Sequence, residues 1–111
     1  MPHIIVEYTD TLGLAISDLL HDLHTDLAGR ESVSIGAIKT RAIPVKHCVV
    51  GEAGGPDTFI HIALKLLPGR SDELKKTMAQ GLFDIAKTHA TKDDVSLSVE
   101  VIDMHAPSYT K

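Results

Sequence analysis

Pro2 is the residue whose position in the chain gives it the most distinctive chemistry. It follows Met1 directly, so removal of Met1 leaves the ring nitrogen as a secondary amine at the amino terminus. A terminal amino group titrates at about pH 7.7–8.0 in model peptides, and burial or nearby positive charge lowers that value. Such a group can act as a general base near neutral pH. The alternative is structural, because a proline is also tolerated where a strand begins.

Three positive side chains could lower the pKa of that amine and bind an anionic substrate. The segment IKTRAI places Lys39 and Arg41 two residues apart, so both point to the same face of a strand. The segment LLPGRS places Arg70 just before a predicted helix, whose free N–H groups add positive potential. Arginine binds carboxylates through two parallel hydrogen bonds, so the set suits a substrate with more than one carboxylate. The alternative for each is a solvated charge, and we interpret Arg30 only as a charge at a helix end.

The histidines give little support for a metal site. His21 and His24 lie three residues apart in HDLH, a spacing that can chelate, but they fall off the apolar stripe of their helix and are interpreted as a solvated face. His3 adjoins Pro2 and His61 lies within a strand, so both are candidate substrate-binding residues. The single cysteine, Cys48, excludes an internal disulfide and the usual zinc spacings. No Ser-His-Asp, GxSxG, GxGxxG or P-loop motif is present.

Hydrophobic periodicity predicts the elements that position these residues. Apolar and β-branched runs predict strands over residues 3–8, 38–45, 58–67 and 95–101, the first buried on most of both faces and the last exposing Ser96, Ser98 and Glu100. Apolar positions three and four residues apart predict two helices. The first is capped by Asp10 or Thr11 and carries Leu12, Ile16, Leu19, Leu20, Leu23 and Leu27, with Gly29 at its end. The second is capped by Ser71 and carries Leu74, Met78, Leu82, Ile85 and Ala86.

The order of these elements repeats, strand-helix-strand twice, over about residues 2–50 and 58–104 of a single domain spanning 1–111. The spacing makes Ile60 the internal counterpart of Pro2. Each half has the form of a parallel β-α-β unit, so we expect an α+β fold with a four-stranded mixed sheet and both helices on one face. A small domain with one sheet face uncovered favours a homo-oligomer.

Composition narrows the class of protein. The 111 residues suffice for one domain, and the net charge of −4 argues against nucleic acid as a partner. The chain begins without a signal-like segment and contains no apolar run of membrane-spanning length, so we expect a cytoplasmic protein with no membrane partner.

Several of these segments together resemble a known family. MPHIIVE, the strand arginine in IKTRAI, and FIHIALKLLPGRS are similar to the 5-carboxymethyl-2-hydroxymuconate isomerase family of the tautomerase superfamily, over nearly the whole chain. The second half, with PGRSDELKK and VSLSVEVIDM, resembles the short 4-oxalocrotonate tautomerases, which explains the repeat as a duplication. The chain is somewhat shorter than is typical of the family, and Lys39 stands where close relatives are expected to have arginine.

The resemblance implies a function and an assembly. Pro2, freed of Met1, matches the proline that moves a proton between carbons, while Arg41 and Arg70 match the arginines that bind carboxylates and polarise the dienol. It further implies a homotrimer that needs no metal or organic cofactor and isomerises an unsaturated di- or tricarboxylate in homoprotocatechuate breakdown. Other tautomerase reactions, such as phenylpyruvate-type tautomerism, decarboxylation or dehalogenation, remain alternatives. A non-catalytic trimeric binding protein is a further one.

Overall fold

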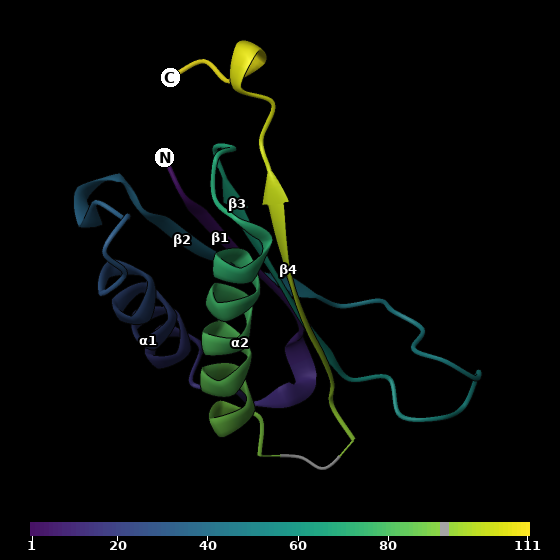
Figure 1. The fold of residues 1–111 in the computed structure, drawn as a ribbon. Coiled ribbons are helices and arrows are strands. Elements are labelled where there is room, and N and C mark those ends of the chain that lie inside the picture. The colour runs from purple at the N-terminus through teal and green to yellow at the C-terminus, as the bar shows by residue number, and fades with distance from the viewer. Residues whose placement is uncertain (92–93) are drawn as a thin grey trace.

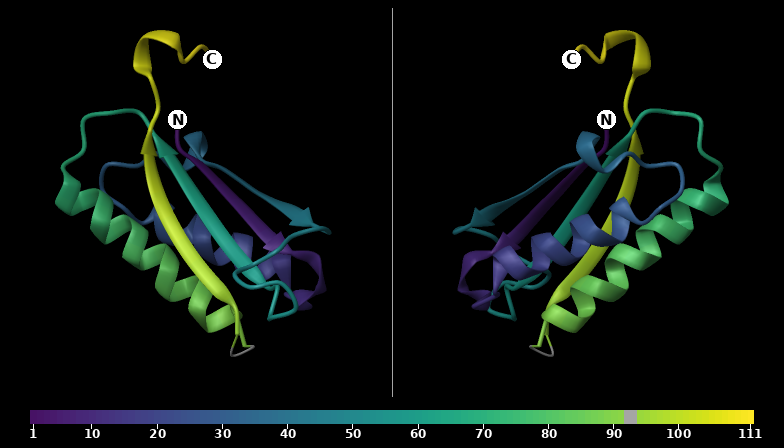
Figure 2. Two further views of the ribbon diagram at one scale, coloured as in Figure 1. Left: turned by 90° about the vertical axis from the view of Figure 1, so that its right-hand side faces the viewer. Right: turned by 90° about the vertical axis from the view of Figure 1, so that its left-hand side faces the viewer.

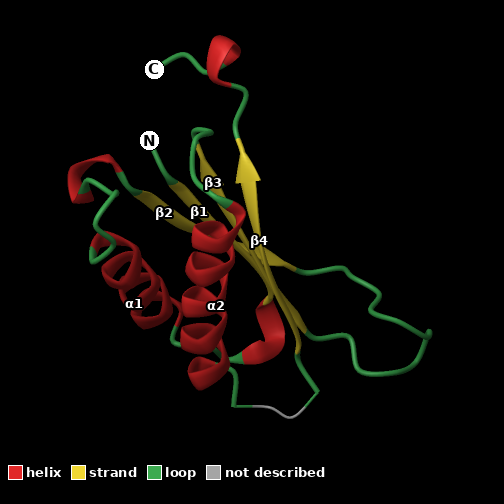
Figure 3. Ribbon diagram, in the orientation of Figure 1, coloured by secondary structure: helices red, strands yellow, loops and turns green. Residues whose placement is uncertain are grey.

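The computed structural model of the chain describes residues 1–91 and 94–111 and contains four strands and two helices, drawn in Figure 1 and by type in Figure 3. In chain order these are β1 (His3–Thr9), α1 (Ile16–Ala28), β2 (Lys39–Val45), β3 (Phe59–Leu66), α2 (Asp72–His89) and β4 (Ser96–Asp103). Short 3-10 helices lie at Asp10–Leu12, Ile35–Ala37 and Ala106–Ser108. No helix within the described residues is both long and apolar enough to cross a membrane.

The four strands form one mixed sheet in the order β2-β1-β3-β4. β1 pairs with β2 in parallel, β3 pairs with β4 in parallel, and the two halves meet through the antiparallel pair β1 and β3. Both helices cover the same face of the sheet, as the two side views in Figure 2 show. The predicted pair of β-α-β units and the predicted mixed sheet are therefore confirmed.

The core lies between the sheet and the helices. Alternate residues of β1 and β3 point toward the helices and are fully buried, among them Ile4, Val6, Ile60, Ile62 and Leu64. The helices meet them with the predicted stripes, of which Leu19, Leu23, Leu27, Met78, Leu82 and Ala86 are buried. Burying one large aliphatic side chain is worth about 1.5–3 kcal/mol, so this layer holds the strand ends, and the site residues on them, in place.

The start of α1 differs from its prediction, whereas the start of α2 agrees. Asp10–Leu12 form a separate 3-10 turn, and α1 begins only at Ile16, after Ala15 and without a side-chain cap. Gly13 has a φ of 67°, a left-handed conformation that ends the turn and that other residues adopt only at a cost. The predicted cap of α2 is confirmed, because the Ser71 hydroxyl accepts a hydrogen bond from the Leu74 N–H at 3.1 Å.

The sheet face away from the helices is open in the single chain. The prediction that β1 is buried on most of both faces is wrong for the single chain, because Glu7 on the open face is exposed and Ile5 is only half-buried. On β4 the predicted exposure of Ser96, Ser98 and Glu100 is confirmed. An open face with an apolar residue at its centre leaves room for a partner surface.

The two halves correspond with a shift of two residues from the prediction. The Lys39 N–H donates to the carbonyl of Pro2 at 3.0 Å, and the equivalent bond in the second half runs from the Ser96 N–H to the carbonyl of Thr58 at 3.0 Å. Thr58, and not Ile60, therefore occupies the place of Pro2 in the hydrogen-bond ladder. Pro2 and Lys39 are 37 positions apart and Thr58 and Ser96 are 38, so the nearly equal lengths of the two halves do not by themselves identify the counterpart of Pro2.

Candidate active site

Pro2 lies at the end of the sheet where β1 begins, between β2 and β3. Its ring is buried, and its carbonyl is held by the Lys39 N–H of β2. The missing N–H of proline costs nothing here, because Pro2 precedes the first paired strand residue. In the structure Met1 stands before Pro2, so the terminal amino group belongs to Met1 and the Pro2 nitrogen is an amide. The amino terminus thus lies at the same end of the sheet as the carboxyl end of β3.

Positive side chains from four parts of the chain gather around this terminus. Partial burial, followed by the charges of Lys111, Arg70 and Lys39, lowers the pKa of the Met1 amino group from its ordinary value of 8.0. Lys65 of β3 lies directly opposite His3 in the antiparallel register and points to the same face. Neither Lys65 nor Lys111 was predicted from the sequence. The strand alternation in FIHIALK indicated the face of Lys65, but nothing indicated the place of Lys111.

His3 joins Arg41 to the carboxyl-terminal tail. The Arg41 guanidinium donates to Nδ1 of His3 at 3.1 Å, and Nε2 of His3 lies 2.9 Å from the Tyr109 hydroxyl oxygen. A guanidinium has no acceptor, so Nδ1 must carry the lone pair and Nε2 the proton. Partial burial, then Arg41, Lys39, the amino terminus and Lys65, lowers the pKa of His3 below its ordinary value of 6.5. The ring is therefore held neutral in one tautomer.

Arg70 reaches the same end of the molecule from the turn before α2. Gly69 has a φ of 126°, which lets the chain turn sharply after β3, and Arg70 follows directly before the Ser71 cap. Its guanidinium donates to the Ser32 carbonyl at 3.0 Å and to the Ser32 hydroxyl at 3.3 Å. Ser32 lies in the loop after α1, so both halves fix this side chain while its charge still acts on the amino terminus.

His61 does not join this group within one chain. It pairs with Glu7 across β1 and β3, four residues along β3 from Lys65, which is roughly 13 Å at the usual strand rise. Its Nε2 lies 2.6 Å from a Glu100 carboxylate oxygen and its Nδ1 lies 2.6 Å from the Ser98 hydroxyl. The side chain is 30% exposed on the open sheet face. Its predicted contact with substrate therefore finds no support in the single chain.

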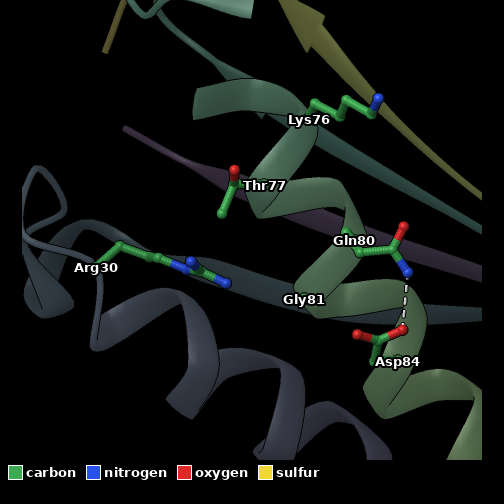
Figure 4. A pocket seen from close by; sticks show the side chains of 6 residues that line it. All are labelled: Arg30, Lys76, Thr77, Gln80, Gly81 and Asp84. Atoms are coloured by element: carbon green, nitrogen blue, oxygen red, sulfur yellow. Dashed lines mark hydrogen bonds between the residues drawn. The ribbon is translucent and has the colours of Figure 1, made fainter. Parts of the chain in front are cut away.

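The remaining candidate groups lie elsewhere. His24 bonds Thr40 of β2 at 2.8 Å instead of lying on a fully solvated helix face, while His21 is exposed. Residues 1–91 and 94–111 hold no cluster of three or more His, Cys, Asp or Glu side chains suited to a metal ion. A cleft of about 430 Å³ lies between α1 and α2, lined by Arg30, Lys76, Thr77, Gln80, Gly81 and Asp84 (Figure 4). It is on the helix side, away from the open-face cations.

In Figure 4, Arg30 reaches from the end of α1 toward Gly81 of α2. The Arg30 guanidinium also pairs with the Asp26 carboxylate at 3.2 Å. Arg30 is thus a helix-end charge, as interpreted, with a second role in joining the helices.

Comparisons with known proteins agree with one another over almost the whole chain. The model of a family described as 5-carboxymethyl-2-hydroxymuconate isomerase matches residues 2–111. The 5-carboxymethyl-2-hydroxymuconate Delta-isomerase of Escherichia coli is 27% identical over 111 residues, covering 95% of this chain and 88% of that protein. A crystal structure of a 5-carboxymethyl-2-hydroxymuconate isomerase from Deinococcus radiodurans R1 has a TM-score of 0.90 at 30% identity, covering 99% of this chain and 87% of that one.

A more distant structure shares the fold alone. It is described as "W0 fused 4-OT wild type symmetric trimer" and has a TM-score of 0.75 at 20% identity, covering 92% of this chain and 86% of that one.

Proposed function

The chain belongs to the 5-carboxymethyl-2-hydroxymuconate isomerase family and is an isomerase, and we propose that it acts as a Delta-isomerase on 5-carboxymethyl-2-hydroxymuconate. The reaction is a proton transfer within one substrate molecule, with no metal or organic cofactor, in the breakdown of homoprotocatechuate. The observation that carries the proposal is an amino terminus set among Lys111, Arg70 and Lys39, where partial burial and then these charges lower the pKa of the Met1 amino group. A base surrounded by cations suits an acid with several carboxylates.

The base in this proposal is the Pro2 nitrogen after loss of Met1. It takes a proton from the enol hydroxyl or an allylic carbon of the substrate, leaving a dienolate, and returns the proton to a carbon further along the conjugated chain. The terminus of the present structure supports this role, because Met1 is bonded directly to Pro2, and Lys111, Arg70 and Lys39 all act on the Met1 amino group. An environment that lowers the pKa of an amine raises its unprotonated fraction at a given pH, and the unprotonated amine is the form that acts as a general base.

The cations bind the carboxylates and stabilise the dienolate. Arg41 and Arg70 are assigned the two main contacts and Lys39 a third, while Lys65 adds positive charge on the same face. Negative charge that develops on the dienolate oxygen is stabilised by donors already fixed in place, such as an Arg70 held by Ser32. His61 stays a prediction for substrate binding that depends on a neighbouring subunit.

The assembly in this proposal is a homotrimer in which the open sheet faces are covered by neighbouring copies. The edge strand β2 supports it, because it carries Ile43 with 47% of its surface exposed on that face. A related fold is described as a symmetric trimer. Sedimentation velocity of the purified protein measures the number of subunits, and a monomer at working concentration contradicts the assembly.

The decisive experiment compares three amino termini. Intact mass first establishes whether Met1 is absent from the active protein. A second protein carries one extra residue joined to Pro2, which turns the nitrogen into an amide, and a third, Pro2→Ala, ends in a primary amine. We expect the extension to lower kcat by about 10²–10⁴-fold, the usual contribution of a general base, and Pro2→Ala to retain part of the activity. Ultraviolet absorbance of the muconate follows turnover. An extended protein with full activity refutes the proposed base.

A further inference from the structure

We propose that Tyr109, in the carboxyl-terminal tail, is a positioning residue that acts through His3 to orient the Arg41 guanidinium toward a substrate carboxylate. The inference rests on the proposed function for the identity of the site. It adds a residue of the tail to that site and gives His3 a role other than direct substrate contact.

The tail is built to bring Tyr109 to this place. It leaves β4 after Asp103, and the Met104 N–H donates to the carbonyl of Leu66 at 2.7 Å, which fastens the start of the tail to the end of β3. The 3-10 turn Ala106–Ser108 follows, and the Tyr109 N–H bonds back to the carbonyls of His105 and Ala106 at 3.0 and 3.3 Å. Figures 1 and 2 show the tail returning over the sheet end where the chain begins.

Tyr109 and His3 are joined both by a short contact between polar atoms and by edge-to-face packing of their rings. The phenol oxygen lies 2.9 Å from Nε2, and the two rings meet edge to face at 80° with their centroids 6.0 Å apart. Because Arg41 donates to Nδ1, the proton of the neutral ring is on Nε2 and the Tyr109 oxygen is its acceptor. The ring is thus held at both nitrogens, and its plane determines where the Arg41 guanidinium lies.

This arrangement leaves Arg41 suited to bind a carboxylate. A guanidinium has five N–H donors in a fixed plane, and His3 engages one nitrogen, so the rest of the plane can form paired bonds with a carboxylate. A His3 ring that turned away from Tyr109 would release Arg41 to many solvated rotamers. Fixing the guanidinium before substrate arrives reduces the conformational entropy that binding must remove.

Partial burial, and then the charges around His3, favour this arrangement as the pH falls, because both lower the pKa of the ring. Arg41 and Lys39 face it from β2, Lys65 from β3 and the amino group from the chain start, all positive, while Tyr109 caps it from the tail. A proton on Nδ1 would end its bond to Arg41 and add a charge to this group. Neutral His3 therefore persists to a lower pH than a histidine with the ordinary pKa of 6.5.

The test measures binding of cis,cis-muconate, a dicarboxylate probe, by titration calorimetry. Tyr109→Phe removes the acceptor while keeping the ring, and Tyr8→Phe makes the same change on the helix side of β1 as a matched control. Loss of one net hydrogen bond is worth about 0.5–1.5 kcal/mol, so we expect Tyr109→Phe to raise Kd about two- to tenfold and Tyr8→Phe to leave it within twofold. Circular dichroism and thermal unfolding check that both variants fold as the wild type does.

A double-mutant cycle separates positioning from a general structural effect. If Tyr109 acts through Arg41, then Tyr109→Phe raises Kd in the wild type but not in an Arg41→Gln background. Equal effects in both backgrounds overturn the inference, as does an unchanged Kd for Tyr109→Phe or no binding of muconate to the wild type. Long-range ¹H–¹⁵N spectra of His3 give a reading independent of binding, since a proton on Nδ1 at pH 7 also overturns it. If a protein with a free Pro2 amine does not isomerise the muconate, but the double-mutant cycle still shows coupling between Tyr109 and Arg41, the proposed isomerisation is refuted and this inference stands.

Discussion

Arg41 offers a sharp test of the proposed substrate contact, because the structure indicates how much of its guanidinium is free. One nitrogen donates to His3 at 3.1 Å, and the rest of the planar group can make two parallel bonds to a carboxylate. Arg41→Lys keeps the positive charge but offers no planar pair of donors. Arg41→Gln removes both. Comparing the two separates geometry from charge.

The size of the effect follows from hydrogen-bond energies. A bond between charged partners is worth about 1.5–3 kcal/mol, and each ~1.4 kcal/mol is tenfold in kcat/KM. Arg41 is exposed in the single chain, so solvent screening places the loss at the lower end. We expect kcat/KM to fall about tenfold for Arg41→Lys and about a hundredfold for Arg41→Gln, mainly through KM, because the substrate carboxylate is bound both before and during proton transfer.

The matched control is Lys46→Gln. Lys46 follows the far end of β2, five residues from Arg41, or roughly 17 Å along an extended chain, and it is also exposed. Lys46→Gln changes the net charge by the same amount as Arg41→Gln, so it measures any general loss of electrostatic attraction for an anionic substrate. The assay is initial-rate absorbance of the muconate at several ionic strengths. Equal losses from Lys46→Gln and Arg41→Gln, or an Arg41→Lys enzyme within twofold of wild type, refute the assigned contact.

A second measurement on the same proteins does not require turnover. Arg41 is one of the groups that lower the pKa of His3, so Arg41→Gln should raise that pKa toward 6.5. Titration of the His3 ring by NMR measures the change, and a His3 pKa equal to that of the wild type contradicts the contact between the two side chains.

Two predictions concern stability. The pKa of His3 is lowered in the fold, mainly by partial burial and then by Arg41, so as the pH falls below 6.5 the unfolded chain binds more protons and the free energy of unfolding decreases. Urea unfolding at a series of pH values should show this decrease, and a His3→Asn variant with the same pH dependence as the wild type contradicts it. In Gly81→Ala, the new Cβ would collide with an Arg30 guanidinium nitrogen and lie 3.1 Å from an Asp26 oxygen, both of them ends of flexible side chains. Alanine gains about 1 kcal/mol over glycine within a helix, and loss of the Arg30–Asp26 pair costs about 0.2–0.5 kcal/mol. We therefore expect chemical unfolding to show a net stabilisation of about 0.5 kcal/mol. A destabilised variant contradicts this expectation and shows that the helices cannot shift to make room for the methyl group.

Local patterns in the sequence were enough to predict most of the fold. Alternation along a strand and steps of three and four along a helix reflect backbone geometry, so the stripe of α2 and its Ser71 cap were found without knowledge of the partner surfaces. The repeated order of elements predicted the mixed sheet for the same reason. The prediction of where α1 begins was wrong because Gly13 ends a short 3-10 turn there, a local conformation that a hydrophobic stripe does not indicate.

The candidate site likewise contains residues that local sequence patterns predicted and contacts that they did not. Pro2 was predicted as a site residue from its position next to Met1, Arg41 from the alternation along its strand, and Arg70 from the turn before its helix. Each of these signals spans only a few residues. The tertiary structure decided which groups meet: it set Lys65 beside His3, brought Tyr109 to His3, and left His61 with Glu100. These contacts depend on the antiparallel register of β1 and β3 and on the path of the tail. Both are determined by packing between segments far apart in the chain, which no local pattern encodes.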